Sequence, residues 1–249
     1  MQAESLHISG PMPKRVVMIS GANRGIGLAI AARLLRDGHR ISLGLRDPQR
    51  FDPAELRSLS KGSDSIHTHY YDAADPDSAK FWVESTVSWA GAVDTIIHCA
   101  GILRETALLF EDGQESDLDD LWQINVMGPW WLTRAAWSYL AGGGAGRIQV
   151  LVSMSGLRVK GRMAGYSVSK FALMGLCQSM RNEGWASGVR VTAICPSWVN
   201  TEMARSVSAV NPDAMSQPEH IATISSALLQ LPNPSVPFEI KLNCALETA

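Results

Sequence analysis

A glycine-rich turn near the start of the chain, Gly21-Ala-Asn-Arg-Gly-Ile-Gly27, limits the possible folds more than any other stretch. An apolar run precedes it over residues 16–19, and residues 28–35 after it have the apolar spacing of a helix. Strand, glycine turn and helix in this order favour a dinucleotide site, because glycines let the backbone approach a pyrophosphate. The helix N-terminus would add N–H donors and positive potential. The spacing is Gly-x-x-x-Gly-x-Gly, not the general Gly-x-Gly-x-x-Gly, so the turn alone is only moderately specific.

The rest of the chain alternates predicted strands with predicted helices. Strands are predicted over residues 15–20, 41–45, 66–71, 93–98, 147–152 and 189–195, with 238–242 as an optional last strand. Helices are predicted over residues 28–36, 75–89, 118–140, 166–186 and 218–231. This alternation predicts an α/β fold whose parallel sheet is covered by helices on both faces. We expect a single domain over residues 14–249, preceded by a flexible tail over residues 1–13.

A second motif, Tyr166-x-x-x-Lys170, lies at the start of a predicted helix. Residues four apart share a helix face, and an ammonium beside a phenol favours phenolate and lowers its pKa from about 10. The tyrosine would then serve as a general acid or base near neutrality. Upstream, Ser153 ends the apolar run over residues 148–152, where its hydroxyl could polarise a carbonyl. Taken alone, Tyr-x-x-x-Lys is more often a surface tyrosine beside a lysine.

The glycine turn, Asn125, Ser153 and Tyr166-x-x-x-Lys170, in this order, resemble the short-chain dehydrogenase/reductase family over nearly the whole chain. The resemblance implies a Rossmann fold, a doubly wound parallel sheet. It also implies interconversion of a carbonyl and a secondary alcohol, with Tyr166 donating the proton to a carbonyl held by Ser153. Lys170 would hold the nicotinamide ribose and keep the tyrosine acidic. Asn125 would hold a water at a local helix distortion, although it could also be a buried residue that satisfies the backbone.

The same resemblance implies a nicotinamide cofactor at the carboxyl ends of the strands. The residues implied in its binding are Gly21, Asn23, Arg24, Gly25, Ile26, Gly27, Arg46, Asp72, Ala100, Gly101, Tyr166, Lys170, Pro196, Val199 and Thr201. Asp72 would contact the adenine, and Val199 and Thr201 would contact the carboxamide. Asp72 has a second reading, as an acid that flanks the following helix.

Two segments depart from the family's pattern. The usual Asn-Asn-Ala-Gly is His98-Cys99-Ala100-Gly101, which keeps the small pair but loses amides that would tie neighbouring strands together. Local stability is therefore more in doubt than chemistry. In 196–201, Ser197 replaces the family's glycine. We read His98 and Cys99 as core residues and His67 and His69 as surface residues, because no spacing supports a metal site.

The end of the second predicted strand favours NADP(H) over NAD(H). NAD-specific relatives place an acid there, which binds the ribose and repels a 2′-phosphate. That place is taken by Leu45, and the next residue, Arg46, has a guanidinium that suits phosphate. Arg24 could approach the same phosphate from the glycine turn. If the strand ends one or two residues later, Asp47 becomes the ribose acid and the preference reverses.

The substrate pocket is the least defined part of the sequence. Its wall is expected from residues 157–163 and 198–217, which follow two of the predicted strands. The residues predicted to contact substrate are Ser155, Leu157, Met163, Trp198 and Met203. They suggest an apolar pocket, but methionine and tryptophan are as often plain packing, and Ser155 could be a simple turn residue.

Composition argues against other classes of partner. The net charge is −2, so a nucleic-acid partner is not expected, and no apolar run has transmembrane length. The four cysteines form no Cys-x-x-Cys pair, and the start is not a secretory signal. We therefore expect a cytoplasmic protein with a small-molecule substrate. Trp122, Trp130, Trp131 and Trp137 would lie on more than one helix face, which predicts a homotetramer or homodimer.

Two other functions remain as alternatives. A redox sensor that binds the dinucleotide without turnover would be expected to lose the tyrosine or the lysine, and both are present. An epimerase or dehydratase of the longer relatives needs more than the roughly fifty residues that follow Pro196.

Overall fold

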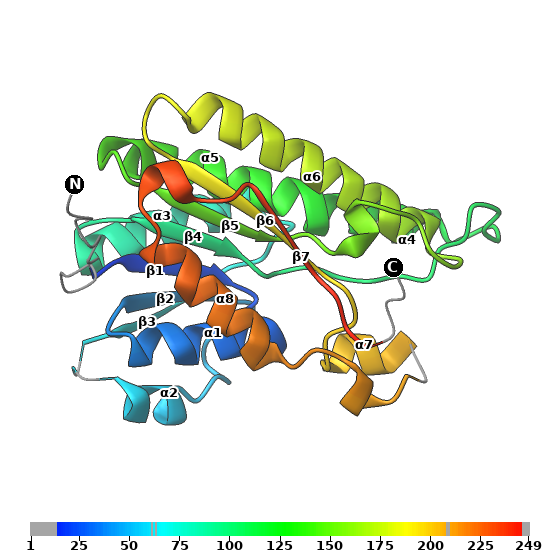
Figure 1. The fold of residues 1–249 in the computed structure, drawn as a ribbon, viewed down its shortest axis with the longest axis horizontal. Coiled ribbons are helices and arrows are strands. Elements are labelled where there is room, and N and C mark those ends of the chain that lie inside the picture. The colour runs from blue at the N-terminus through cyan, green and yellow to red at the C-terminus, as the bar shows by residue number, and fades with distance from the viewer. Residues whose placement is uncertain (1–13, 61, 63, 208–209, 246–249) are drawn as a thin grey trace, which may run out of the picture.

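One seven-stranded sheet forms the centre of the molecule, with the strand order β3-β2-β1-β4-β5-β6-β7 (Figure 1). The computed structural model describes residues 14–60, 62, 64–207 and 210–245, so the predicted tail over residues 1–13 lies outside the described residues. Every strand pairing is parallel, as predicted. The strands are β1 (Val16–Ser20), β2 (Arg40–Leu45), β3 (Ile66–Tyr70), β4 (Thr95–His98), β5 (Arg147–Leu151), β6 (Arg190–Pro196) and β7 (Glu239–Leu242).

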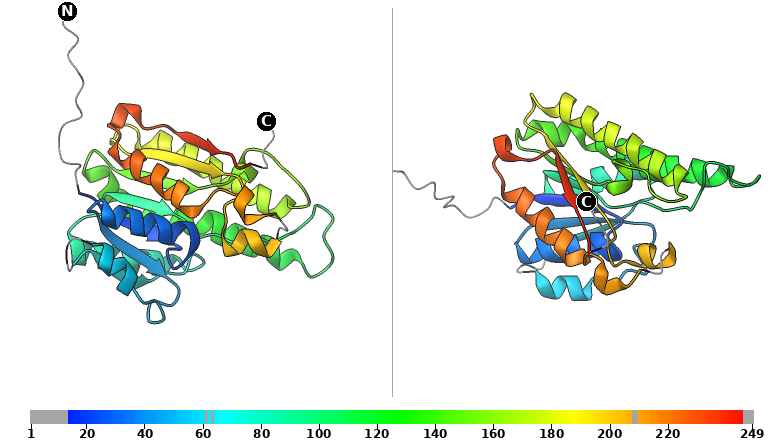
Figure 2. Two further views of the ribbon diagram at one scale, coloured as in Figure 1. Left: turned by 60° about the horizontal axis from the view of Figure 1, so that its bottom comes forward. Right: turned by 45° about the vertical axis from the view of Figure 1, so that its right-hand side comes forward.

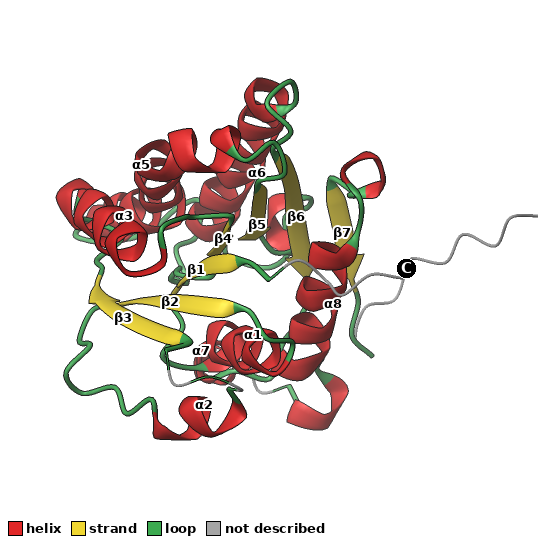
Figure 3. Cartoon of the chain, turned by 90° about the vertical axis from the view of Figure 1, so that its left-hand side faces the viewer, coloured by secondary structure: helices red, strands yellow, loops and turns green. Residues whose placement is uncertain are grey.

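Helices cover both faces of the sheet (Figure 3). On one face lie α3 (Pro76–Ala90), α5 (Gly128–Gly142) and α6 (Ala164–Gly184). On the other lie α1 (Gly25–Arg36), the short α2 (Ala54–Leu59) and α8 (Pro218–Gln230), with α1 packed along α8. The predicted doubly wound Rossmann architecture is therefore confirmed.

The core is divided between these faces, because successive strand residues point to opposite sides. Met18, Ile96 and Ile148 pack toward α3, α5 and α6. Ile19 and Ile41 pack toward α1 and α8. The strands β1, β2 and β4 are buried along almost their whole length, as expected of parallel strands covered on both faces, and in β1 this appears in the sequence as the apolar run over residues 16–19.

The helix predicted over residues 118–140 is interrupted. It consists of α4 (Glu115–Trp122), a π-helical segment η1 (Gln123–Met127) and α5. Pro129 follows the segment, and a proline lacks the N–H that would continue an α-helical ladder. Such π-helical turns occur mostly as single interruptions of α-helices and often at functional sites.

Two short helices were not predicted, α2 and α7 (Glu202–Val207). Each has six residues, too few for a helical apolar period to be recognised. Between β4 and α4 the chain extends away from the body of the fold (Figures 1 and 2). In the described residues, no helix combines the length and apolar character needed to span a bilayer.

The strand order reverses between β1 and β4, since β1 is followed on one side by β2 and β3 and on the other by β4 and β5. Crossover connections leave this point in opposite directions and open a crevice beyond the carboxyl ends of the strands. The candidate site lies there.

Candidate active site

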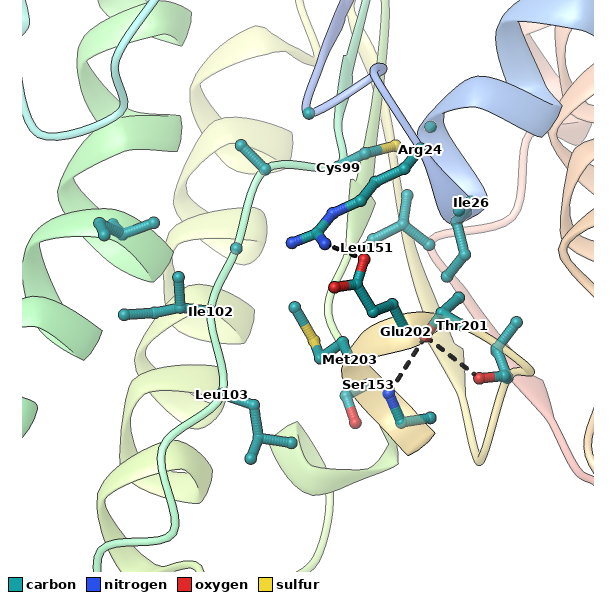
Figure 4. Close-up of a pocket in the computed structure, with 18 of the residues that line it drawn as sticks. Arg24, Ile26, Cys99, Ile102, Leu103, Leu151, Ser153, Thr201, Glu202 and Met203 are labelled. Atoms are coloured by element: carbon teal, nitrogen blue, oxygen red, sulfur yellow. Dashed lines mark hydrogen bonds and ion pairs between the residues drawn. The ribbon is translucent and has the colours of Figure 1, made fainter. Parts of the chain in front are cut away.

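A cleft with a volume of about 1180 Å³ lies over the carboxyl ends of the strands. Ligand pockets usually measure roughly 300–1,000 Å³, so this cleft has room for more than one small ligand. Every residue predicted to bind the cofactor lines it, as do Ser153, Tyr166 and Lys170. Figure 4 shows part of its wall, with Ser153 facing the segment that carries Glu202 and Met203.

The glycine turn fits closely against the end of β4. Gly21 has a φ of +66°, and a Cβ added to it would lie 2.7 Å from the backbone nitrogen of Ala100. A Cβ on Gly27 would lie 2.4 Å from the carbonyl oxygen of Gly21. No larger residue fits at either place. The Ser20 hydroxyl accepts hydrogen bonds from the backbone N–H groups of Cys99 and Ala100, at 3.2 and 3.1 Å.

The N-terminus of α1 points its N–H groups into the cleft end formed by this turn. The residue before the helix, Arg24, makes no side-chain cap, and the first turn holds no acidic residue. Uncapped N–H groups and the helix dipole favour an anion at such a place. The glycine turn and the N-terminus of α1 together therefore fit the pyrophosphate of a dinucleotide.

Ser153 follows β5 in an unusual backbone conformation. Its φ of +123° and ψ of 155° lie in a region normally occupied only by glycine, and it has the only positive φ of any described residue other than glycine. Such a conformation costs roughly 1–3 kcal/mol. The Ser153 hydroxyl accepts a hydrogen bond from the Ser155 N–H at 3.1 Å and is also hydrogen-bonded to the Tyr166 hydroxyl.

Tyr166 and Lys170 lie on one face of α6 near its start, as predicted. The Lys170 Nζ atom is 5.7 Å from the centre of the tyrosine ring and donates to the Leu151 carbonyl oxygen at 3.1 Å. Both side chains are buried in the floor of the cleft. A phenol, an ammonium and the Ser153 hydroxyl are thus brought together.

Burial changes the pKa values in a way that the sequence analysis did not predict. It raises the pKa of Tyr166 to about 12, against which the hydrogen bond with Ser153 acts. It also lowers the pKa of Lys170 to about 8. The predicted lowering of the tyrosine pKa is not found in the protein without ligand, because the loss of solvation outweighs the hydrogen bond with Ser153. Tyr166 keeps its proton at neutral pH.

Asn125 lies in η1 and is completely buried. Its Oδ1 accepts from the Ile102 N–H at 2.9 Å, and its Nδ2 donates to the Ile102 carbonyl at 3.0 Å and the Ser169 hydroxyl at 3.0 Å. The amide therefore joins the segment after β4 to α6. A Cβ on Gly101 would lie 3.1 Å from Asn125 Oδ1 and 3.7 Å from Lys170 Nζ, so both polar groups border the space beside this glycine. Its role in holding a water stays a prediction.

At the other end of the cleft, β2 ends at Leu45, where the sequence analysis placed its end. Arg46 follows at the rim of the cleft and is exposed. Asp47 forms an ion pair with Arg50 at 3.2 Å. Arg24 forms an ion pair with Glu202 of α7 across the cleft (Figure 4).

Asp72 lies at a place that is compatible with both readings of the sequence. It lines the cleft, and its carboxylate accepts a hydrogen bond from the Ala74 N–H at 2.9 Å in the turn before α3. The cap of that helix is Asp75, which accepts from the Asp77 N–H at 3.0 Å.

The departures from the family's pattern have visible local consequences. His98 is buried at the end of β4, and its Nε2 shares a hydrogen bond of 2.9 Å with the Thr133 hydroxyl of α5. Its Nδ1 is buried with no partner. Burial lowers the pKa of His98 to about 3. His67 and His69 stack on each other on β3, away from the cleft, and no described group of three or more His, Cys, Asp or Glu side chains could hold a metal ion.

The residues predicted to contact substrate lie in the cleft only in part. Ser155, Met163, Trp198 and Met203 line the cleft. Leu157 does not: its partly buried side chain packs against the core between the sheet and α3, α5 and α6, so the structure gives no support to its predicted contact with substrate. Among the cleft residues that the sequence analysis did not name are three cations, Arg158, Lys160 and Arg205. The absence of any acid between Ser153 and Lys170 was the signal that could have revealed the first two.

Comparisons with known proteins agree with this architecture. The family model of the short chain dehydrogenases matches residues 15–211. The agropine synthesis reductase of Rhizobium rhizogenes is 34% identical over 233 residues, which are 94% of this chain but 53% of the relative. This chain therefore spans about half the length of that relative. The oxidoreductase UcpA of Salmonella typhimurium is 32% identical over 235 residues, which are 93% of this chain and 86% of that relative.

A solved structure is also similar. The alcohol dehydrogenase of the archaeon Thermococcus sibiricus, complexed with 5-hydroxy-NADP, superposes with a TM-score of 0.85 at 26% identity. The match covers 95% of this chain and 99% of that one.

Proposed function

Because the chain belongs to the short-chain dehydrogenase family of oxidoreductases, which act on CH–OH and carbonyl groups with a nicotinamide dinucleotide, we propose a specific activity for it. It is an NADP(H)-dependent enzyme that interconverts a carbonyl and a secondary alcohol, with Tyr166 as general acid and base. The observation that carries this proposal is the group formed by Ser153, Tyr166 and Lys170 in the floor of the cleft.

The three side chains have complementary roles in reduction. The bound nicotinamide would supply the hydride. Ser153 donates a hydrogen bond to the carbonyl oxygen of the substrate and orients it toward Tyr166. Tyr166, which holds its proton because burial raises its pKa to about 12, donates that proton as negative charge develops on the oxygen. The ammonium of Lys170 then stabilises the phenolate, which has no bulk water around it.

The cleft also supports a preference for the phosphorylated cofactor. Leu45 ends β2 and offers no acceptor to a ribose hydroxyl. Arg46 stands next to it at the rim, and Asp47 is paired with Arg50. A 2′-phosphate would meet a guanidinium at this place instead of a carboxylate.

Replacement of Tyr166 by phenylalanine tests the mechanism. Tyr166→Phe removes only the hydroxyl, so NADPH binding and the fold should be unchanged. The rate of NADPH-dependent reduction, measured over a panel of aldehydes and ketones, should fall by roughly 10²–10⁴. Tyr139→Phe, at an exposed tyrosine of α5, is the matched control and should leave the rate unchanged. Near-normal turnover by Tyr166→Phe would refute the mechanism, and a wild type without turnover would favour a sensor.

Replacement of Arg46 by alanine tests the cofactor preference. A charge-assisted hydrogen bond is worth roughly 1.5–3 kcal/mol, so Arg46→Ala should weaken NADPH binding at least tens-fold. NADH binding should change little, because NADH lacks the phosphate. Fluorescence titration of both cofactors against the wild type and the variant measures this. Tighter binding of NADH than of NADPH by the wild type would reverse the assignment.

A further inference from the structure

An ion pair joins two walls of the cleft beside the glycine turn. Arg24 precedes α1 on one wall, and Glu202 is the first residue of α7 on the other (Figure 4). The two segments also come close together here, since a Cβ added to Gly25 would lie 3.3 Å from the Thr201 Cγ2 atom. The pair therefore lies where the start of α7 meets the glycine turn.

Arg24 belongs to the part of the cleft that fits phosphate. It is the residue before α1, whose N-terminus has neither a side-chain cap nor an acidic residue in its first turn. Its guanidinium donates to the Glu202 carboxylate. A guanidinium binds a carboxylate and a phosphate through the same kind of paired N–H donors. Glu202 therefore takes up donors that a phosphate of the cofactor would use.

The other described acids that line the cleft have partners of their own. Asp47 forms an ion pair with Arg50, and Asp72 accepts the hydrogen bond from the Ala74 N–H. Glu202 is thus the described acid that contacts the glycine turn. Besides engaging Arg24, its carboxylate would repel a phosphate bound close by, because like charges repel. Both effects oppose cofactor binding.

The Arg24–Glu202 pair can exchange its partners easily. The two side chains are 59 and 68% exposed, so water reaches both charges. An ion pair as exposed as this contributes little to stability. Arg24 can therefore leave Glu202 for a phosphate without leaving a buried carboxylate unpaired.

We propose that Glu202 limits the affinity of the cleft for its cofactor, because its carboxylate competes with a cofactor phosphate for Arg24. Two phosphates fit this description: the 2′-phosphate, which only NADPH has, and the pyrophosphate, which NADPH and NADH share. In the first case Glu202 also lowers the preference for NADPH that Arg46 supports. This inference rests on the proposed function and adds a residue that sets cofactor affinity.

A charge-neutral variant tests the competition. Glu202→Gln keeps the size of the side chain, and fluorescence titration should show roughly two- to fivefold tighter NADPH binding, the factor that an exposed ion pair is worth. Tightening of NADPH alone identifies the 2′-phosphate, and tightening of NADH as well identifies the pyrophosphate. Glu219→Gln removes the same charge from an exposed residue of α8 outside the cleft and should leave both affinities unchanged.

A double-mutant cycle tests whether the effect passes through Arg24. Arg24→Gln alone should weaken the binding of each dinucleotide that Glu202→Gln tightens. In the Arg24→Gln background, Glu202→Gln should lose most of its effect, because no guanidinium is left to release. If Glu202 acted only by shaping α7, its replacement would have the same effect in both backgrounds.

The outcomes separate this inference from the proposed function. Unchanged or weaker NADPH binding by Glu202→Gln would overturn the competition, as would an undiminished effect in the Arg24→Gln background, and either result leaves turnover by the wild type intact. Conversely, tighter binding by Glu202→Gln in a protein that turns over none of the carbonyl panel would refute the proposed activity and support the competition. If the wild type and Glu202→Gln bind neither dinucleotide, both proposals are overturned.

Discussion

At the scale of single residues, the site depends on side chains whose backbone conformation or burial costs free energy in the folded protein. Ser153 has a backbone conformation normally reserved for glycine, and burial disfavours the charged forms of Tyr166 and Lys170, which raises the pKa of the tyrosine and lowers that of the lysine. Strain and desolvation of this kind gather at functional sites, where the surrounding fold holds the residues in place. Neither could be predicted from the sequence, because neither a φ value nor the loss of solvation follows from residue spacing.

The lowered pKa of Lys170 predicts a pH dependence. The lysine is charged below about pH 8 and loses its charge above it. If its charge stabilises the phenolate of Tyr166, kcat/KM for reduction should be level below pH 8 and fall about tenfold per unit above it. Lys170→Arg keeps the charge across this range, so this alkaline limb should disappear even if the variant is slower. Initial rates from pH 6 to 10 measure both profiles, and an unchanged limb in Lys170→Arg would disprove the assignment.

At the scale of elements, the sequence predicted the sheet well. All seven strands predicted from the sequence are present in the sheet, and β2 ends at Leu45 as predicted. Apolar spacing did not reveal the π-helical segment at Asn125, because it continues from α4 into α5, and only the family resemblance implied a local helix distortion there. It missed α7, whose six residues bring Met203 and Arg205 to the cleft. Long periodic elements are encoded locally, whereas these features depend on tertiary packing.

His98 of β4, which is hydrogen-bonded to Thr133 of α5, predicts that the stability of the folded protein depends on acid pH. The folded protein keeps His98 neutral with a pKa near 3, below the value of about 6.5 for an unfolded chain. Between these pH values only the unfolded chain binds the proton, so stability is lost as the pH falls below 6.5. His98→Asn should remove this loss, so between pH 7 and 5 the wild type should lose ~2 kcal/mol more free energy of unfolding than the variant. Urea unfolding measures this, and equal losses would show that His98 does not titrate as described.

At the scale of the whole molecule, one side of the fold carries large exposed apolar side chains. They lie on neighbouring helices: Trp122 on α4, Trp130 on α5 and Phe171 on α6, with exposed fractions of 47, 48 and 44%. The sequence analysis predicted that the tryptophans of this region would lie on more than one helix face. Trp131 and Trp137 are accordingly half-buried and pack against the core. Apolar patches on exposed helices mark interfaces more often than free surface.

We therefore predict that the protein is a homodimer or homotetramer whose subunits meet through these helices. A stable interface buries about 800 Å² on each partner and depends on a few central aromatic residues. Phe171→Glu places a charge inside that contact and should weaken association at least thirtyfold, since loss of a central aromatic residue costs about 2 kcal/mol or more. Phe81→Glu is the matched control, because Phe81 is also exposed, at 56% against 44% for Phe171, but lies on α3. Light scattering at micromolar concentration should show an oligomer for the wild type and Phe81→Glu and a monomer for Phe171→Glu. A monomeric wild type would refute the prediction, and an oligomer that survives Phe171→Glu would move the interface to another face.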